Sequence, residues 1–147
     1  MSEDATGAGF SAQEKAAMKQ RTEELKAMKG VKGAAKTAKE YQACLDAIAA
    51  LEGVDRVIGE RLHVIVAEEA PQLAPKTFYG FPAYARDGKI VVFYQPASKF
   101  DTRYGTISFD DAAALDDGVV WPVSYAVLQM TEEVEQQFRA LVRRAAG

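Results

Sequence analysis

Cysteine, histidine and long apolar runs are scarce in this chain of 147 residues. The single cysteine, Cys44, excludes an intramolecular disulfide framework and favours a reducing compartment, so we expect a cytoplasmic protein. The longest apolar runs fall well short of the ~20 residues that a membrane-spanning helix requires, and the first residues do not form a signal-peptide pattern. We therefore expect no membrane partner.

Motifs of common enzyme classes are also missing. The sequence contains no Gly-x-Gly-x-x-Gly, no Gly-x-x-x-x-Gly-Lys-Ser/Thr and no Gly-x-Ser-x-Gly. His63 is the sole histidine, and Glu60-x-x-His63 occurs once, whereas di-iron bundles that use this spacing need two copies. We therefore expect His63 on a helix surface, Cys44 as a buried structural thiol, and no enzymatic activity.

Positive charge is concentrated at the N-terminal end. Residues 1–39 carry eight basic and five acidic side chains, and residues 40–147 carry ten basic and sixteen acidic ones. This change predicts a basic arm over 1–39, with a helix over about 11–28 and a flexible linker, followed by a domain over 40–147. The arm is either a phosphate-binding tail, and then the one candidate nucleic-acid contact, or a tether or helix resting on the acidic body. We expect no nucleic-acid partner, since no aromatic residue interleaves its lysines.

Three helices are predicted in the body. Apolar residues recur at helical spacing within residues 41–51, 58–66 and 134–145. Gly53 is placed to end the first helix, Pro71 stops the second, and Thr131 precedes the third with acidic residues in its first turn.

The middle of the chain predicts antiparallel strands. Asp87-Gly88 joins strands over 81–85 and 89–95, because Asp-Gly is typical of a type I′ hairpin turn. Further strands are predicted over 104–109 and 119–127, and Pro82 and Pro122 place their own strands at an edge or a bulge. The order of elements predicts a two-layer α+β domain, in which helices back an antiparallel sheet of about four or more strands.

The aromatic residues between 78 and 125 indicate a ligand pocket. Several are tyrosines whose hydroxyls need partners, and the loop over 96–103 adds Lys99 and Arg103, which suit a carboxylate or phosphate. We expect both cations to point into one cleft lined by at least two of the rings; the alternative is an aromatic core with cations at its rim. The candidate ligand-binding residues are Lys76, Tyr79, Tyr84, Gln95, Lys99, Arg103, Tyr104 and Trp121.

Four aspartates flank a short alanine-rich segment and give an alternative metal site. They are Asp110, Asp111, Asp116 and Asp117. Carboxylate oxygens are the ligands that hard cations prefer, but the same residues fit a helix cap and a turn. We expect no metal cofactor, with iron as the alternative.

Several sequence blocks resemble the YdhG-like family of domains of unknown function. Residues 75–84 contain Tyr79-Gly80-Phe81-Pro82, which is similar to the family's Tyr-Gly-x-Pro block, and residues 95–100, 115–118 and 121–122 are similar to later blocks of one branch. The resemblance covers about residues 40–146 and implies a curved antiparallel sheet backed by helices, with no established reaction. It also implies a second function, a frataxin-like iron chaperone, because some relatives carry that label.

Together these features predict a non-enzymatic module of the YdhG-like type, which either binds a small ligand, possible ligands being anionic, or serves as an interaction module. The alternatives are an iron-delivery protein that uses the four aspartates and an enzyme of unknown reaction.

Overall fold

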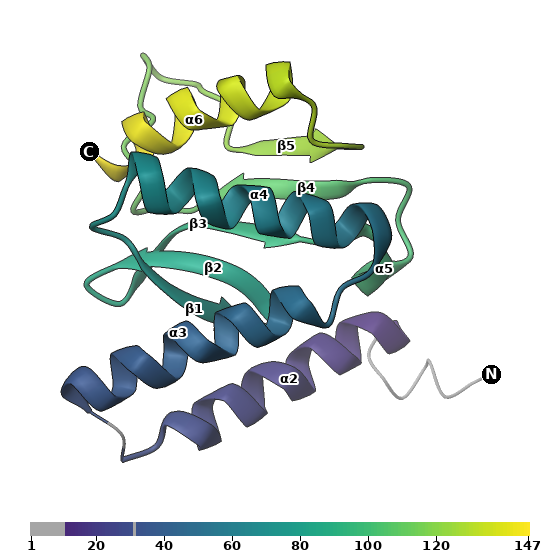
Figure 1. The fold of residues 1–147 in the computed structure, drawn as a ribbon, viewed down its shortest axis with the longest axis vertical. Helices are drawn as coiled ribbons and strands as arrows, with labels where there is room; N and C mark the ends of the chain where they lie inside the picture. Colours follow the sequence, from purple (N-terminus) through teal and green to yellow (C-terminus); the bar gives the residue numbers. More distant parts are fainter. Residues whose placement is uncertain (1–10, 31) are drawn as a thin grey trace.

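The computed structural model describes residues 11–30 and 32–147 (Figure 1). It confirms the predicted α+β fold, in which a curved antiparallel sheet is backed by helices. The elements are, in chain order, α2 (Ala12–Met28), α3 (Gly33–Ala49), α4 (Gly53–Glu69), β1 (Ala74–Phe78), β2 (Phe81–Arg86), β3 (Lys89–Gln95), α5 (Ala97–Phe100), β4 (Gly105–Phe109), β5 (Ser124–Val127) and α6 (Glu132–Ala146).

The sheet is a meander in which each strand pairs antiparallel with the next, in the order β1-β2-β3-β4-β5. The turn between β2 and β3 is the predicted Asp87-Gly88 turn, with positive φ at both residues (52° and 81°). A second turn of the same kind joins β1 to β2, where Tyr79 and Gly80 have φ of 56° and 80°. The strand β1 is not predicted from the sequence, because it is short and half-buried and contains Pro75.

Two expectations about proline-containing strands need correction. The strand of Pro82 is not at an edge, since β1 pairs with it on its outer side, although β2 does carry a register shift between Tyr84 and Ala85, close to the predicted bulge. Proline is tolerated there because the pairing of β2 with β3 begins one residue later, at Ala83, so its missing N–H removes no bond of that ladder. The strand predicted over 119–127 is β5 alone, and Val119 and Val120 before it are almost fully exposed.

The core lies between one face of the sheet and the helices. Figure 1 shows α3, α4 and α6 side by side across that face, with α3 over β1 and β2. The predicted stripes of α4 and α6 supply much of the core, including Leu62 and Ile65 from α4 and Phe138 from α6. At roughly 25 cal/mol per Å² of apolar surface, this burial is the main stabilising term.

Charged side chains join α4 to α6 at the rim of the core. Glu135 accepts two hydrogen bonds from Arg61, at 2.9 and 2.7 Å, and a third from Arg139. Arg139 also pairs with Glu68 and Glu69, and Arg143 pairs with Glu69. These arginines hold the pKa of Glu135 at about 2.

The N-terminal segment differs from its prediction at the linker. The helix over 11–28 is confirmed as α2, and Ser11 and Glu14 form the predicted capping box. However, α3 begins at Gly33 and runs through the expected boundary near Lys39, so only residues 29–32 separate the two helices. In the described chain, no helix combines the length and the apolar character needed to cross a membrane.

Candidate functional site

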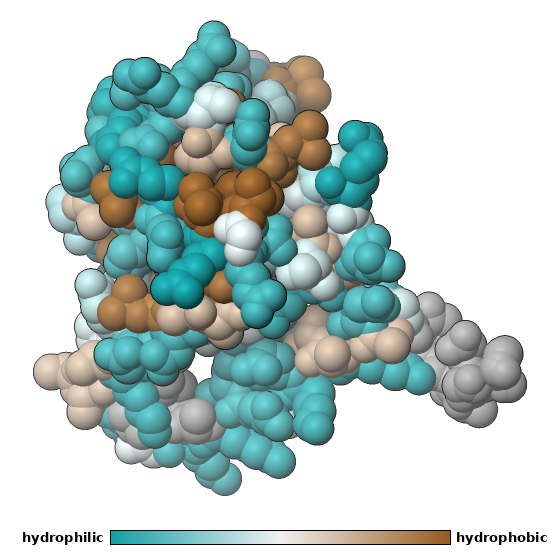
Figure 2. Space-filling view, turned by 45° about the vertical axis from the view of Figure 1, so that its right-hand side comes forward, coloured by the Kyte–Doolittle hydropathy of each residue, from teal (hydrophilic) through white to brown (hydrophobic). Residues whose placement is uncertain are grey.

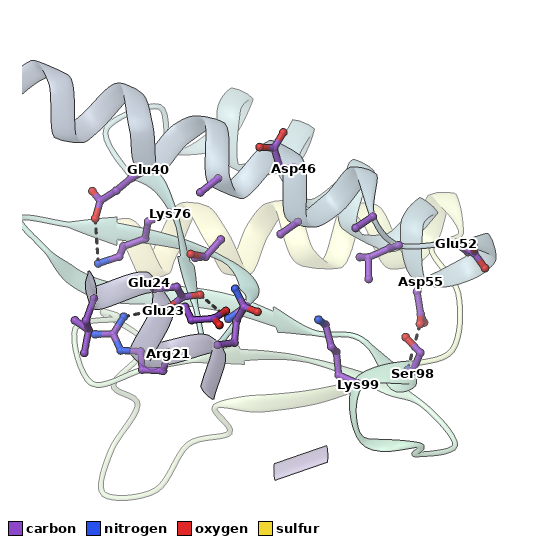
Figure 3. A pocket seen from close by; sticks show the side chains of 18 of the residues that line it. Arg21, Glu23, Glu24, Glu40, Asp46, Glu52, Asp55, Lys76, Ser98 and Lys99 are labelled. Atoms are coloured by element: carbon purple, nitrogen blue, oxygen red, sulfur yellow. Dashed lines mark hydrogen bonds and ion pairs between the residues drawn. The ribbon is translucent and has the colours of Figure 1, made fainter. Parts of the chain in front are cut away.

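A groove of about 1050 Å³ opens between α2, α3, the β1–β2 turn and α5 (Figure 3). The residues lining it are Gln20, Arg21, Glu23, Glu24, Leu25, Lys36, Glu40, Ala43, Asp46, Ala47, Ala50, Leu51, Glu52, Asp55, Lys76, Thr77, Gly80, Ser98 and Lys99. On the face shown in Figure 2, the lower part of the molecule is mainly hydrophilic.

The composition of α3 explains the hollow. One face of this helix buries Cys44 and Ile48 in the core. The neighbouring face, directed at the groove, repeats small residues at helical spacing, with Ala43, Ala47 and Ala50. Because these side chains end at Cβ, they do not fill the space between α3 and α2, and their methyl groups line the groove between charged side chains.

The β1–β2 turn holds α2 in place. Both amides of the turn donate to the carboxylate of Glu24: Tyr79 to Oε1 at 3.2 Å and Gly80 to Oε2 at 2.6 Å. Arg21 also reaches Oε1 of Glu24 at 3.4 Å, and its guanidinium lies 5.4 Å from the centre of the Phe78 ring. The Glu24 side chain is therefore 10% exposed, although the described part of α2 contains no buried residue.

Charges of both signs line the groove, with six carboxylates and four cations. Glu40 pairs with Lys76 at 3.6 Å. Lys99 projects from α5 into the groove, and among the described residues it has no ion-pair partner (Figure 3). Glu23 and Glu52 likewise have no ion pair within the described chain, so a ligand here meets free groups of both signs.

The end of the groove near α5 is anchored to α4. The backbone N–H of Ser98 donates to Oδ2 of Asp55 at 3.2 Å, and the Tyr94 hydroxyl donates to the Asp55 carbonyl at 3.0 Å. Burial raises the pKa of Tyr94, so its hydroxyl stays protonated as a donor. The Ser98 bond connects the short helix that carries Lys99 to α4, and the Tyr94 bond connects β3 to the same residue of α4.

The structure brings together few of the predicted ligand-binding residues. Lys76 and Lys99 line the groove, but Arg103 does not share it, because its guanidinium lies 5.1 Å from the centre of the Tyr104 ring. The expected cleft with Lys99, Arg103 and two rings is therefore wrong as a geometry. Tyr79 is in the β1–β2 turn, Gln95 is at the end of β3, and Trp121 packs against the core from the loop before β5.

Tyr84 belongs to a polar group inside the core. Its hydroxyl lies 3.1 Å from Nδ1 of His63 and 3.8 Å from Sγ of Cys44. Burial raises the pKa of Cys44 to about 11 and lowers the pKa of His63. Cys44 is buried as predicted, but His63 is half-buried and contacts Tyr84 rather than lying on the helix surface.

The four aspartates of the alternative metal site do not form a group. Asp110, Asp111, Asp116 and Asp117 are all exposed, on the segment between β4 and β5. Within residues 11–30 and 32–147, no three His, Cys, Asp or Glu side chains are placed to hold a metal ion. Iron binding stays a prediction, and no group of ligands for it is formed by the described residues.

The sequence does not predict most of the groove residues, because the charge pattern of residues 1–39 favours a separate basic arm and does not show where α2 lies. The signal was the second face of α3, where Glu40, Ala43, Asp46 and Ala50 share a side of the helix that is distinct from the apolar stripe. The hydrogen-bond partners of Glu24 could not be predicted in the same way. They are backbone amides, and backbone amides occur in almost every residue, so no residue type marks them.

Comparisons of the chain with protein-family models, with curated proteins and with solved structures found no match. The resemblance to the YdhG-like family therefore stays a prediction.

Proposed function

We propose that this protein is a non-enzymatic binding module whose ligand lies in the groove between α2 and α3. The observation that carries the proposal is the ammonium group of Lys99, which has no ion-pair partner among the residues that the structure describes and points into the groove. A cation held in this way suits a carboxylate or phosphate group of a ligand.

The remaining charges refine the chemistry of the ligand. Glu23 and Glu52 are carboxylates without an ion-pair partner in the described chain, and they lie on walls of the same groove as Lys99. A purely anionic ligand would be repelled by them. We therefore propose an amphoteric ligand, such as an amino acid or short peptide, with its anionic group at Lys99 and its cationic groups toward the acidic walls.

Two observations support a role in binding rather than catalysis. The cysteine that could act as a nucleophile lies in the core, and its pKa of about 11 keeps the thiol protonated at neutral pH. The sole histidine contacts Tyr84 and not the groove. A cytoplasmic location is part of the same proposal, and it rests on the single free cysteine.

A thermal-shift screen at low salt tests the proposal. The probes are citrate, spermidine and the dipeptide Lys-Glu, which are anionic, cationic and amphoteric. We expect the dipeptide to raise the melting temperature most, because a ligand at ~100 times its Kd adds about 2.7 kcal/mol to stability. Lys99→Gln removes the cation that is expected to bind the anionic group of the dipeptide, and it should weaken dipeptide binding about tenfold.

Lys89→Gln is the matched control, because Lys89 is an exposed lysine at the β2–β3 turn, away from the groove. It should leave the shift unchanged. Equal losses in both variants, or a shift with no preference for the amphoteric probe, would remove the groove as the binding site.

A further inference from the structure

The β1–β2 turn is a carboxylate-binding site that the chain fills with its own Glu24. In a type I′ turn the two central amides point outward and make no bond within the hairpin. Here both amides bind one carboxylate, one to each oxygen, at 3.2 and 2.6 Å, and Arg21 adds a third donor. Tyr79 adopts a φ of 56°, which is unusual for a bulky residue and directs its amide to Glu24.

The helix that supplies this carboxylate is attached by few contacts. No described side chain of α2 is buried, and Met18 and Leu25 are 41% and 57% exposed. The contacts that hold the helix include Glu24 on the turn, Arg21 on Phe78, and Gln20 against Gly80, and α2 also lies against α5. Loss of the Glu24 bonds would therefore weaken the attachment of α2 at the turn.

The connection between α2 and α3 is short. α2 ends at Met28 and α3 begins at Gly33, and Gly30 and Gly33 have φ of 79° and 65°. Short hinges of this kind favour the exchange of a terminal element between copies, since each exchanged contact repeats the contact within one chain.

From these observations we infer that the β1–β2 turn of one copy accepts the Glu24 carboxylate of a second copy, so that α2 is exchanged between two chains. The occupant is a second copy because its helix already carries the residues that fit the site, Gln20, Arg21 and Glu24. In the exchanged dimer each groove is completed by α2 of the other chain. This inference goes beyond the proposed ligand and does not depend on it.

The first experiment measures the receptor site in full-length protein. A labelled peptide of residues 11–28 is titrated into the Glu24→Gln chain, in which the glutamine can accept one turn amide but presents an NH₂ group to the other. We expect this chain to bind the peptide at least tenfold more tightly than the wild-type chain, whose site is filled at high effective concentration.

Two variant peptides of equal charge give the matched control. Glu24→Gln in the peptide should weaken binding at least tenfold, whereas Glu23→Gln should not, because Glu23 makes no bond to the turn. Equal binding of the two peptides, or no binding to a folded Glu24→Gln chain, would overturn the inference.

The second experiment tests the occupant by complementation. Glu24→Gln removes the carboxylate that α2 supplies and leaves the turn intact. Gly80→Val instead blocks the turn as an acceptor of α2, since a Cβ there would lie 2.6 Å from Cγ of Gln20. A mixture of the two full-length variants should form a 1:1 heterodimer in sedimentation, while each variant alone sediments as a smaller species. If the mixture sediments as the sum of its parts, a second copy is not the occupant, even if the peptide binds.

Discussion

At the scale of single residues, two glycines in the same backbone conformation differ in what surrounds them. Gly88 has a φ of 81°, and a Cβ added to it would have no neighbouring atom within 4 Å, whereas a Cβ added to Gly80 would meet Gln20 of α2. Gly88→Ala should therefore cost about 1–2 kcal/mol, through left-handed strain alone. Gly80→Ala should cost more, and chemical denaturation measures the difference.

A second substitution separates the strain of the left-handed backbone from the contact with Gln20. Gln20→Ala removes the Cγ atom at 2.6 Å and leaves Cβ at an ordinary 3.6 Å. Combined with Gly80→Ala, it should bring the loss of stability back to the level of Gly88→Ala. If the double variant is no more stable than Gly80→Ala, α2 does not pack on the turn in solution.

His63 should make the stability of the protein depend on pH just below neutrality. Burial lowers its pKa in the folded state, so the unfolded chain binds a proton first as the pH falls below about 6.5. The free energy of unfolding should therefore decrease from pH 7 toward pH 5. The slope of this decrease should correspond to the uptake of at most one proton on unfolding. His63→Gln should flatten this part of the profile, and parallel profiles for the two proteins would contradict the assignment.

At the scale of elements, the ion pairs between α4 and α6 should act through Glu135. Its pKa in the folded state, about 2, lies below its ordinary value, so its contribution is complete above about pH 4.5 and is lost as the pH falls toward 2. Glu135→Gln should lower stability by about 1–2 kcal/mol at neutral pH, because Arg61 and Arg139 lose their shared acceptor.

Denaturant titrations at several pH values test this, with Asp116→Asn as the control for a lost exposed carboxylate. The control should change stability by less than about 0.5 kcal/mol. The difference between wild type and Glu135→Gln should shrink as the pH approaches 2. A constant difference would mean that the glutamate acts by packing and not by charge.

The elements that could be predicted from sequence are those with a strong local pattern. Helical spacing located α4 and α6, and Asp87-Gly88 located the central hairpin. In contrast, β1 was missed because its five residues carry no alternation, and its turn uses Tyr79 where asparagine, aspartate or glycine is usual. Local sequence propensity does not predict the conformation of such residues, because the surrounding structure determines it.

At the scale of the whole molecule, the groove could not be predicted because it depends on how α2 docks. The charge pattern of residues 1–39 predicts a separate basic arm, but polar contacts hold α2 on the sheet: Glu24 accepts hydrogen bonds from two backbone amides that belong to no sequence motif. Lys76 and Lys99 were found as cations near aromatic strands. Arg103 was grouped with Lys99 because it is close in sequence, but its side chain lies against Tyr104.

The order of the strands has a consequence for how the protein is made. Every pairing in the sheet joins strands that follow each other along the chain, so each loop closure is short and its entropic cost is small. A nascent chain can therefore add β2 to β1, and each later strand to the last, as it leaves the ribosome. The packing of α6 on α4 is different, because it joins elements that are far apart in the sequence and therefore closes a long loop.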